Sequence, residues 1–277
     1  SFFGGGFSSS SRRNGPERGD DIELMLNISF EEAAFGCKKE IMFDKIERCS
    51  KCSGSGAAPG STAQTCSTCR GSGQVRTTQR TILGMMQTMN TCPACNGTGK
   101  IIKDPCPDCK GKGNVKTRKK IEVAIPQGID NGQNVVLRGL GNDGYRGGPS
   151  GDLYVHINVS KHDIFTRRGS NIYCDVPITF VEAALGAEIS VPTLQGETKY
   201  RIPEGSQTST SFTLKGKGIP VINSRSRGDL IFTVIVETPK NLTKEQKDYL
   251  MKFSGVCDDA KYSKRQLFLN KFLNKKR

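Results

Sequence analysis

The sequence predicts a mainly β protein: two homologous β-sandwich-like modules in tandem, a zinc-binding β-hairpin region inserted in the first, and short C-terminal helices. Three observations predict this fold class. Parts of the chain repeat at a fixed offset, all the paired cysteines fall within extra length in the first copy, and alternating apolar residues mark strands in both copies. A chain of 277 residues is long enough for two or three domains of ordinary size.

An internal repeat locates the two modules. The motif Ile125-Pro126-x-Gly128 recurs as Ile202-Pro203-x-Gly205, and Gly151-Asp152-Leu153 recurs as Gly228-Asp229-Leu230, both 77 residues later. Upstream, residues 30–36 resemble residues 180–186 at an offset of 150. Since the offset falls from 150 to 77, the first copy carries about 73 extra residues between the two matched segments.

The modules themselves are predicted to consist of strands separated by Gly and Pro turns. Apolar side chains recur at every second position of residues 22–30, the period of a half-buried strand, and residues 153–159 and 230–236 are rich in β-forming types. Residues 30–36 and 180–186 are expected to form short helical turns. We therefore predict a first module at 20–45 and 115–160, an insertion at 46–114 and a second module at 161–240.

The two ends of the chain differ in composition from the modules. Residues 1–19 are mostly Gly, Phe, Ser and Arg, which predicts a disordered Gly/Phe linker remnant, and the absence of an initial Met favours truncation of a longer chain. At 241–277, a capping-box pattern at Thr243 and Gln246 precedes apolar residues at helical spacing, and a second short helix is expected after it. This apolar segment packs either on its own module or on a second chain.

Four Cys-x-x-Cys-x-Gly-x-Gly repeats occupy the insertion. Two residues between paired cysteines let both sulfurs reach one metal, and the glycines allow the backbone to fold closely around the thiolates. Zn²⁺ takes four ligands in a tetrahedron, and no histidine lies in the insertion, so eight cysteines predict two closed zinc sites.

The pairing of these repeats follows from a predicted hairpin. Residues 75–81 and 85–91 flank Leu83-Gly84 as two strands, which brings the second repeat beside the third and leaves the first for the fourth. The predicted cofactors are two Zn²⁺ per chain, and the predicted ligands are Cys49, Cys52, Cys106 and Cys109 for the first zinc, and Cys66, Cys69, Cys92 and Cys95 for the second.

Net charge and the lengths of basic and apolar runs bear on two classes of function, nucleic-acid binding and membrane insertion. The formal charge of +14 falls to roughly +10 if eight thiolates hold two Zn²⁺. Such a surface attracts nucleic acids or acidic proteins, but no basic run interleaved with aromatics occurs, apart from the short Lys275-Lys276-Arg277 end. Nucleic-acid binding is therefore a weaker alternative. No apolar run reaches 18 residues, which excludes a membrane-spanning helix.

Cysteine usage points to a reducing compartment, the cytoplasm. Three lone cysteines, Cys37, Cys174 and Cys257, accompany the eight paired ones, which is atypical of a secreted disulfide scaffold, and we expect them to have structural roles. A thiol oxidoreductase, a third alternative, typically carries a single Cys-x-x-Cys near a βαβ unit. Neither a phosphate loop nor a nucleophile with a paired base is visible, so no enzymatic activity is expected.

The cysteine repeats, set in the first of two β modules, resemble the DnaJ family of heat-shock cochaperones, in the class with the cysteine-rich region. The segments Asn171-Ile-Tyr-Cys-Asp-Val-Pro-Ile, Val191-Pro-Thr-Leu-Gln-Gly and Gly228-Asp-Leu look like its bacterial members. The family's J domain, with its His-Pro-Asp signature, is absent from this sequence. The resemblance thus implies that this chain by itself does not stimulate ATP hydrolysis by a DnaK-type partner.

The resemblance also implies a function. It suggests a molecular cochaperone that binds unfolded client proteins, prevents their aggregation and delivers them to a DnaK-type ATP-driven chaperone. By the same resemblance, clients bind an apolar groove on the first module, and a homodimer forms through residues 241–277. Ile22, Ile41 and Phe43 align with that groove, and Leu137 is expected to join it.

Overall fold

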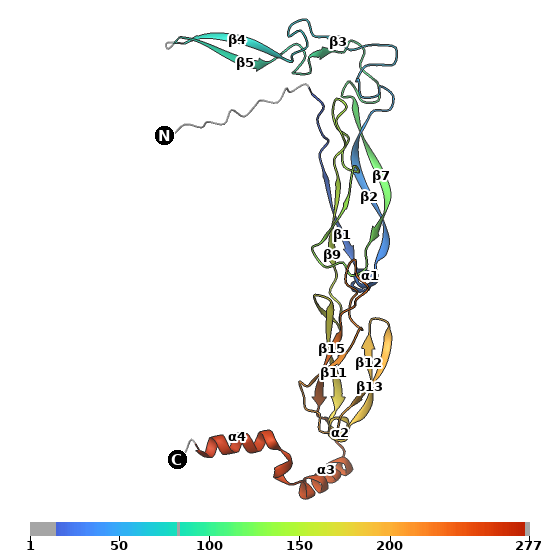
Figure 1. The fold of residues 1–277 in the computed structure, drawn as a ribbon, viewed down its shortest axis with the longest axis vertical. Coiled ribbons are helices and arrows are strands. Elements are labelled where there is room, and N and C mark those ends of the chain that lie inside the picture. The colour runs from blue at the N-terminus through green and yellow to red at the C-terminus, as the bar shows by residue number, and fades with distance from the viewer. Residues whose placement is uncertain (1–14, 82–83, 275–277) are drawn as a thin grey trace. The chain divides into compact units, whose positions relative to one another are not determined.

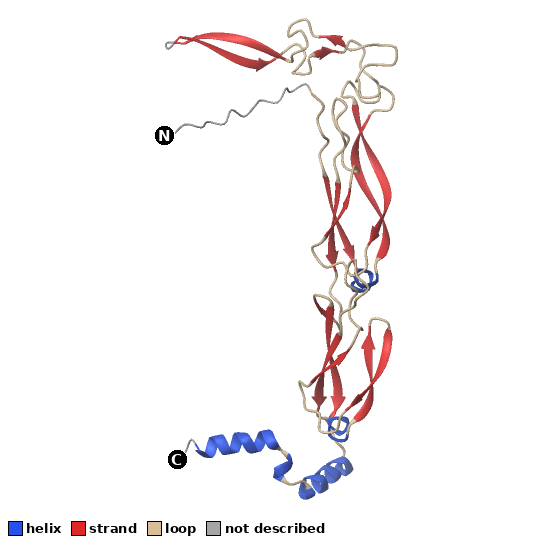
Figure 2. Ribbon diagram, in the orientation of Figure 1, coloured by secondary structure: helices blue, strands red, loops and turns tan. Residues whose placement is uncertain are grey.

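The computed structural model describes residues 15–81 and 84–274, and strands predominate in it (Figures 1 and 2). The chain divides into two compact units. One comprises the residues up to Ile172 together with Lys215–Asp229, and the other comprises Tyr173–Leu214 and the residues from Leu230 onward. None of the helices in the described ranges is long and apolar enough to cross a membrane. Of the predicted disordered linker at 1–19, residues 1–14 lie outside the described residues, as do the turn residue Leu83 and the basic end at 275–277. The last residues of this segment are ordered instead, because the N–H groups of Glu17 and Gly19 donate to Tyr145 at 3.0 Å and Pro149 at 2.9 Å.

Two sheets build the first module. Strand β1 (Ile22–Ile28) runs parallel to β9 (Leu153–Val159), and β8 (Asn134–Leu137) pairs antiparallel with the other edge of β9. Strands β2 (Cys37–Arg48) and β7 (Asn114–Ile125) form a separate antiparallel pair whose register runs from Cys37 opposite Ile125 to Arg48 opposite Asn114. Because alternate side chains point to one face of each strand, both sheets present an apolar face.

The apolar faces of the two sheets meet in one core. The buried residues come from both sheets and from the segments joining them: Ile28, Ala33, Ile41, Phe43, Val123, Ile125, Ile129, Leu153, Val155 and Ile157. The outer face of the β2–β7 pair carries charged side chains that pair across the strands, such as Lys38 with Glu122 at 3.0 Å. This polar-out, apolar-in alternation confirms the predicted sandwich-like module.

A short helix follows β1 earlier than the alternating pattern suggests. The predicted strand at 22–30 ends at Ile28, because Ser29 caps helix α1 (Phe30–Phe35). The Ser29 hydroxyl accepts the N–H of Glu32 at 3.1 Å, and the Glu32 carboxylate accepts the N–H of Ser29 at 2.9 Å. This reciprocal capping box satisfies two N–H groups at the start of the helix and competes with continuation of the strand.

The second module repeats the order of elements seen in the first. Its larger sheet has the order β10 (Thr166–Arg168), β11 (Asn171–Thr179), β15 (Leu230–Glu237), β14 (Ser211–Leu214), and the smaller pairs β12 (Ala187–Thr193) with β13 (Gly196–Ile202). Helix α2 (Phe180–Leu185) has the same capping box, formed by Thr179 and Glu182. The offset of 77 is visible in hydrogen bonds as well: Asp152 accepts the N–H of Gly139 at 2.7 Å, and Asp229 accepts that of Gly216 at 2.8 Å.

The insertion leaves the first module at the end of β2 and returns at the start of β7. It contains two short antiparallel pairs, β3 (Gln64–Thr65) with β6 (Lys100–Ile101), and β4 (Gln74–Thr81) with β5 (Gly84–Thr91). The second pair is the predicted hairpin, with Gln74 opposite Thr91.

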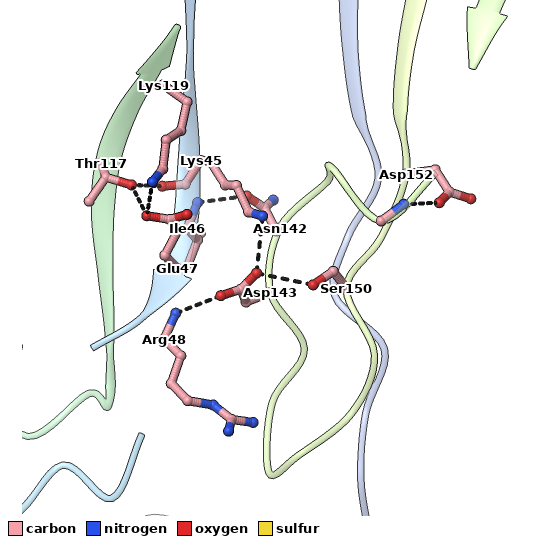
Figure 3. A network of polar contacts seen from close by, with 11 residues as sticks. Lys45, Ile46, Glu47, Arg48, Thr117, Lys119, Asn142, Asp143, Ser150 and Asp152 are labelled. Atoms are coloured by element: carbon pink, nitrogen blue, oxygen red, sulfur yellow. Dashed lines mark hydrogen bonds and ion pairs between the residues drawn. The ribbon is translucent and has the colours of Figure 1, made fainter. Parts of the chain in front are cut away.

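A polar network fixes the last residues of β2 before the first cysteine (Figure 3). Asp143 lies 3.1 Å from the ammonium of Lys45 and accepts the backbone N–H of Arg48 at 2.9 Å. Its neighbour Asn142 accepts the N–H of Ile46 at 2.8 Å, and the hydroxyl of Ser150 donates to Asp143 at 3.0 Å. The loop that carries Asn142, Asp143 and Ser150 therefore fixes the point where the insertion begins, through an ion pair and through hydrogen bonds to the backbone of β2.

Helical segments end the described chain, as predicted. Helix α3 (Lys244–Val256) begins with the Thr243–Gln246 capping box, and the 3₁₀ turn η1 (Asp259–Lys261) leads to α4 (Ser263–Asn274). Helix α3 has no buried residue, and Phe268 on α4 is 68% exposed. Of the two open alternatives, packing of the apolar faces on the chain's own module is not seen among the described residues.

Candidate zinc centres

The insertion brings its eight paired cysteines together as two groups of four. Within each group, all the sulfur atoms lie within 4.8 Å of one another. The groups are the two sets that the sequence predicts: Cys49, Cys52, Cys106 and Cys109, and Cys66, Cys69, Cys92 and Cys95. All eight side chains are buried.

The spacing of the sulfurs fits a tetrahedral metal ion. Zn–S bonds of roughly 2.3 Å place the corners of a tetrahedron roughly 3.8 Å apart. The Sγ atoms of Cys49 and Cys106 are 3.8 Å apart, and those of Cys52 and Cys109 are 3.6 Å apart. The second group has 3.9 Å between Cys66 and Cys92, and 3.6 Å between Cys69 and Cys95. Each group can therefore hold one zinc ion.

Backbone hydrogen bonds join the two repeats of each centre reciprocally. In the first centre, the N–H of Cys49 donates to Gly113 at 2.9 Å, and the N–H of Cys106 donates to Gly56 at 2.8 Å. In the second, Cys66 donates to Gly99 at 2.9 Å and Cys92 to Gly73 at 3.0 Å. The same pattern in both centres shows that each is a pair of equivalent loops facing one another.

The second cysteine of each repeat also accepts a backbone N–H. Gly56 donates to the Cys52 sulfur at 3.3 Å, and the other three repeats have the same contact at 3.2 to 3.3 Å. Burial acts to raise the pKa of the Cys52 thiol, but this N–H and the neighbouring sulfurs outweigh it and lower the pKa, whereas burial and the neighbouring sulfurs raise the pKa of the Cys109 thiol in the same centre. Hydrogen bonds to sulfur favour the thiolate, the form that binds zinc.

Glycine is required where the two loops of a centre meet. Gly99 has a φ of +72°, and a Cβ there would lie 2.3 Å from the carbonyl oxygen of Gly71. Gly73 stands in the same relation to Gly97, at 2.4 Å. The fourth residue after each cysteine pair therefore needs both the left-handed backbone and the absence of a side chain.

The two histidines lie away from the cysteine groups. The Nε2 atom of His162 is 3.1 Å from Glu31, and His156 bonds to Asn134 at 2.7 Å. With four buried sulfurs around each centre, no ligand position is left for a reactive water. This arrangement is that of a structural zinc site rather than a hydrolytic one.

The lone cysteines lie outside both centres. Burial raises the pKa of the Cys174 thiol to about 11 and also raises that of Cys37. The thiol of Cys257 donates to the Tyr262 hydroxyl at 3.4 Å. A raised pKa makes a thiol a poor nucleophile, in keeping with the structural roles expected for Cys37 and Cys174.

The four residues predicted to bind clients gather in the first module. Ile41 and Phe43 on β2 belong to its core and are 9% and 5% exposed, whereas Ile22 and Leu137 are half-buried and pack against that core. Ile22 and Leu137 both lie opposite Leu153, one on each side of β9. The side chains therefore form one apolar cluster, with two members partly open to solvent.

Sequence reasoning missed Asn142 and Asp143. The loop that carries them recurs in the second module at the offset of 77, where Ile219 and Pro220 take their places. Ile219 is fully buried there, while Asn142 and Asp143 make polar contacts with β2. The sequence signal for Asn142 and Asp143 is therefore this difference between the two copies of the loop, which have equal length but carry polar residues in the first module and apolar residues in the second.

The sequence is similar to known chaperones over nearly all of its length. Residues 22–239 match the family described as DnaJ C terminal domain. The protein named Chaperone protein DnaJ of Ruminiclostridium cellulolyticum is 52% identical over 98% of this chain and 72% of its own length. The proteins of the same name from Acetivibrio thermocellus and Clostridium beijerinckii are 50% and 52% identical, over 98% and 97% of this chain and 70% and 72% of their own lengths.

Proposed function

Because the chain belongs to the DnaJ family of chaperones, we propose that its first β module holds extended, apolar segments of unfolded client proteins. The chain is a cochaperone, and binding of unfolded clients and of a DnaK-type chaperone follows from its family. The proposal concerns which residues make contact with the client.

The observation that carries this proposal is the open edge of β2. In the described part of the chain, β2 pairs with β7 alone, so its other edge offers unpaired backbone groups up to Ile46 and Arg48, whose N–H groups bond to Asn142 and Asp143. An extended client segment can add to such an edge as a further strand and place alternate side chains in apolar pockets. Ile41 and Phe43 lie on the inward face of this strand, and the half-buried Ile22 and Leu137 pack on the same core.

Zinc has a structural role in this proposal. The buried residues of the two insertion clusters are the cysteines, and the apolar side chains packed on them are Val115 for one and Val75 and Ile101 for the other. Such clusters bury too little apolar surface to fold unaided, so metal–sulfur bonds replace a hydrophobic core. No catalytic group of this chain is needed. Cysteines held as zinc-bound thiolates, and not as disulfides, persist in a reducing compartment, and we place the protein in the cytoplasm.

We further propose that the chain forms a homodimer through α3 and α4. Leu267 and Phe268 on α4 are 61% and 68% exposed, and Phe253 on α3 is 54% exposed. Apolar surface of this extent marks an interaction site. Two client sites in one dimer gain avidity on a long unfolded chain, since the second contact becomes intramolecular.

Suppression of aggregation without ATP tests the proposal. The zinc-loaded chain is mixed with a chemically denatured protein on dilution, and light scattering is followed. Ile22→Ser removes a half-buried member of the cluster, while Met25→Ser changes a side chain of the same strand that is 75% exposed. We expect protection by the wild type and by Met25→Ser, and a several-fold higher protein requirement for Ile22→Ser. Equal protection by all three would refute the assigned site.

A further inference from the structure

The insertion has an unusual distribution of charge. Between Glu47 and Asp104 the sequence contains no Asp or Glu, whereas it contains seven cations: Arg48, Lys51, Arg70, Arg76, Arg80, Lys100 and Lys103. Among the described side chains of this stretch, only Lys51 forms an ion pair, with Asp108 at 3.0 Å. After Cys52, the structure describes the side chains of four of these cations, and all four are exposed: Arg70, Arg76, Lys100 and Lys103.

The zinc centre does not cancel this charge. Four thiolates and one Zn²⁺ carry a net charge of about −2, and in the second centre they are buried. Five of the cations, from Arg70 to Lys103, lie in the part of the chain that surrounds that centre. The second centre and its hairpin therefore keep a positive exterior.

One face of the β4–β5 hairpin combines this charge with methionine. The register sets Arg76 opposite Met89 and Arg80 opposite Met85, and residues two apart share a face of the ribbon. The side chains of Met85 and Met89 are 75% and 56% exposed, and Arg76 is exposed. The opposite face carries Thr77 and Asn90, whose side chains bond to each other at 3.2 Å.

We propose that the hairpin face bearing Arg76, Met85 and Met89 binds an extended acidic segment of a partner protein that also carries apolar side chains. Methionine is unbranched and adapts to differently shaped apolar partners, and guanidinium groups pair with carboxylates. A positive surface without carboxylates of its own also attracts an acidic partner over distance. This site goes beyond the proposed client site, which lies on β2 of the first module.

The observations favour a peptide over a nucleic acid. The stretch from Arg48 to Lys103 contains no Phe, Tyr, Trp or His on which bases could stack. Proteins that bind single strands without sequence preference use such rings together with positive charge. Exposed methionines, in contrast, match apolar side chains and not a phosphate backbone.

Fluorescence anisotropy with a labelled peptide of alternating Glu and Leu tests the proposal on the zinc-loaded chain. A second peptide has Lys in place of Glu, and labelled oligothymidine serves as the nucleic-acid probe. The test variant is Arg76→Gln with Met89→Gln. The matched control on the opposite face is Thr77→Ala with Asn90→Ala, and Ile22→Ser reports any contribution of the proposed client site.

We expect the Glu–Leu peptide to bind the test variant about tenfold more weakly, and to bind the control and Ile22→Ser variants like the wild type. Added salt should weaken this binding. Unchanged affinity in the test variant, or equal binding of the Lys peptide, would overturn the proposal. Tighter binding of oligothymidine that depends on Arg76 would also overturn it, in favour of a nucleic-acid surface. Loss of binding in Ile22→Ser alone would assign the peptide to the client site instead.

Discussion

The carboxylate of Asp143 lies 3.1 Å from the ammonium of Lys45, three residues before the last residue of β2. The Lys45 side chain is 11% exposed and that of Asp143 is 27% exposed, so the pair is largely withdrawn from water. The same carboxylate accepts the backbone N–H of Arg48, the residue before the first zinc ligand. The side chain of Asp143 therefore joins a loop of the first module to the end of β2, where the zinc-binding insertion begins.

Asp143→Ala should destabilise the first module. Removal of one partner of a buried pair leaves the other charge uncompensated, and for this partly exposed pair we expect a loss of about 2 kcal/mol in the free energy of unfolding. The control is Asp44→Ala, which breaks an ion pair with Lys116 on the outer face, where both side chains are more than half exposed. That change should have little effect. Urea unfolding, followed by circular dichroism, compares the two variants. Equal losses in the free energy of unfolding would show that the Asp143 ion pair contributes no more to stability than an exposed one.

The same contact predicts a pH dependence. Burial acts to raise the pKa of Asp143, but hydrogen bonds from the Arg48 N–H and Lys45 outweigh it and hold the pKa below its ordinary value of 3.8. A carboxyl whose pKa is lower in the folded state stabilises the fold above its unfolded pKa, and this contribution is lost as the pH falls through the folded value. Carboxyl-carbon NMR should give a midpoint below 3.8 for Asp143 and a higher one in Lys45→Met. Equal midpoints would rule out a contribution from Lys45.

Replacement of one zinc ligand should remove one zinc ion and leave the other. In Cys92→Ser, the second centre keeps three thiolates and loses its closed tetrahedral set, while the first centre is unchanged. Native mass spectrometry should then find one Zn²⁺ per chain, against two for the wild type and for the control Cys174→Ser. Loss of both ions from Cys92→Ser would contradict two independent centres.

A methyl group at Gly99 should disturb the second centre far more than one at Gly60. Both glycines have a positive φ, +72° and +86°, so alanine is strained at either position. A Cβ at Gly99 would lie 2.3 Å from the Gly71 oxygen, whereas one at Gly60 meets nothing within 4 Å. We expect about 1 kcal/mol of strain at Gly60 and, at Gly99, several-fold faster zinc release to a chelator. Similar rates of zinc release from the two variants would show that the loops of the second centre move apart to accommodate the added methyl group.

Much of the fold was predictable because the repeat and the cysteines constrain it jointly. The offsets of 77 and 150 fixed two modules and an insertion, and the hairpin then left one nested pairing of the repeats. Two capping boxes show where local sequence patterns succeed and fail. The pattern at Thr243 and Gln246 predicts the start of α3, whereas Ser29 lies within an apolar alternation that continues to Phe30 and predicts strand, although Ser29 caps α1.

Other features depend on contacts between distant parts of the chain. The strand pattern of 22–30 does not reveal that β1 lies parallel to β9, more than a hundred residues later. Asn142 and Asp143 contact β2 about 95 residues upstream, through side chains that resemble ordinary loop residues. Ile22 is half-buried and Phe43 is buried, although both are large apolar residues. The elements that cover each side chain decide this difference, and residue type does not predict it.

Hydrogen exchange of the zinc-loaded chain, with and without a reduced and alkylated unfolded protein, tests the central claim most directly. A client strand added to β2 should protect backbone N–H groups on its open edge around Ile41 and Phe43, and Ile22→Ser should diminish that protection. Protection confined to the second module or to the β4–β5 hairpin, with β2 unchanged, would contradict the assignment of client binding to the first module.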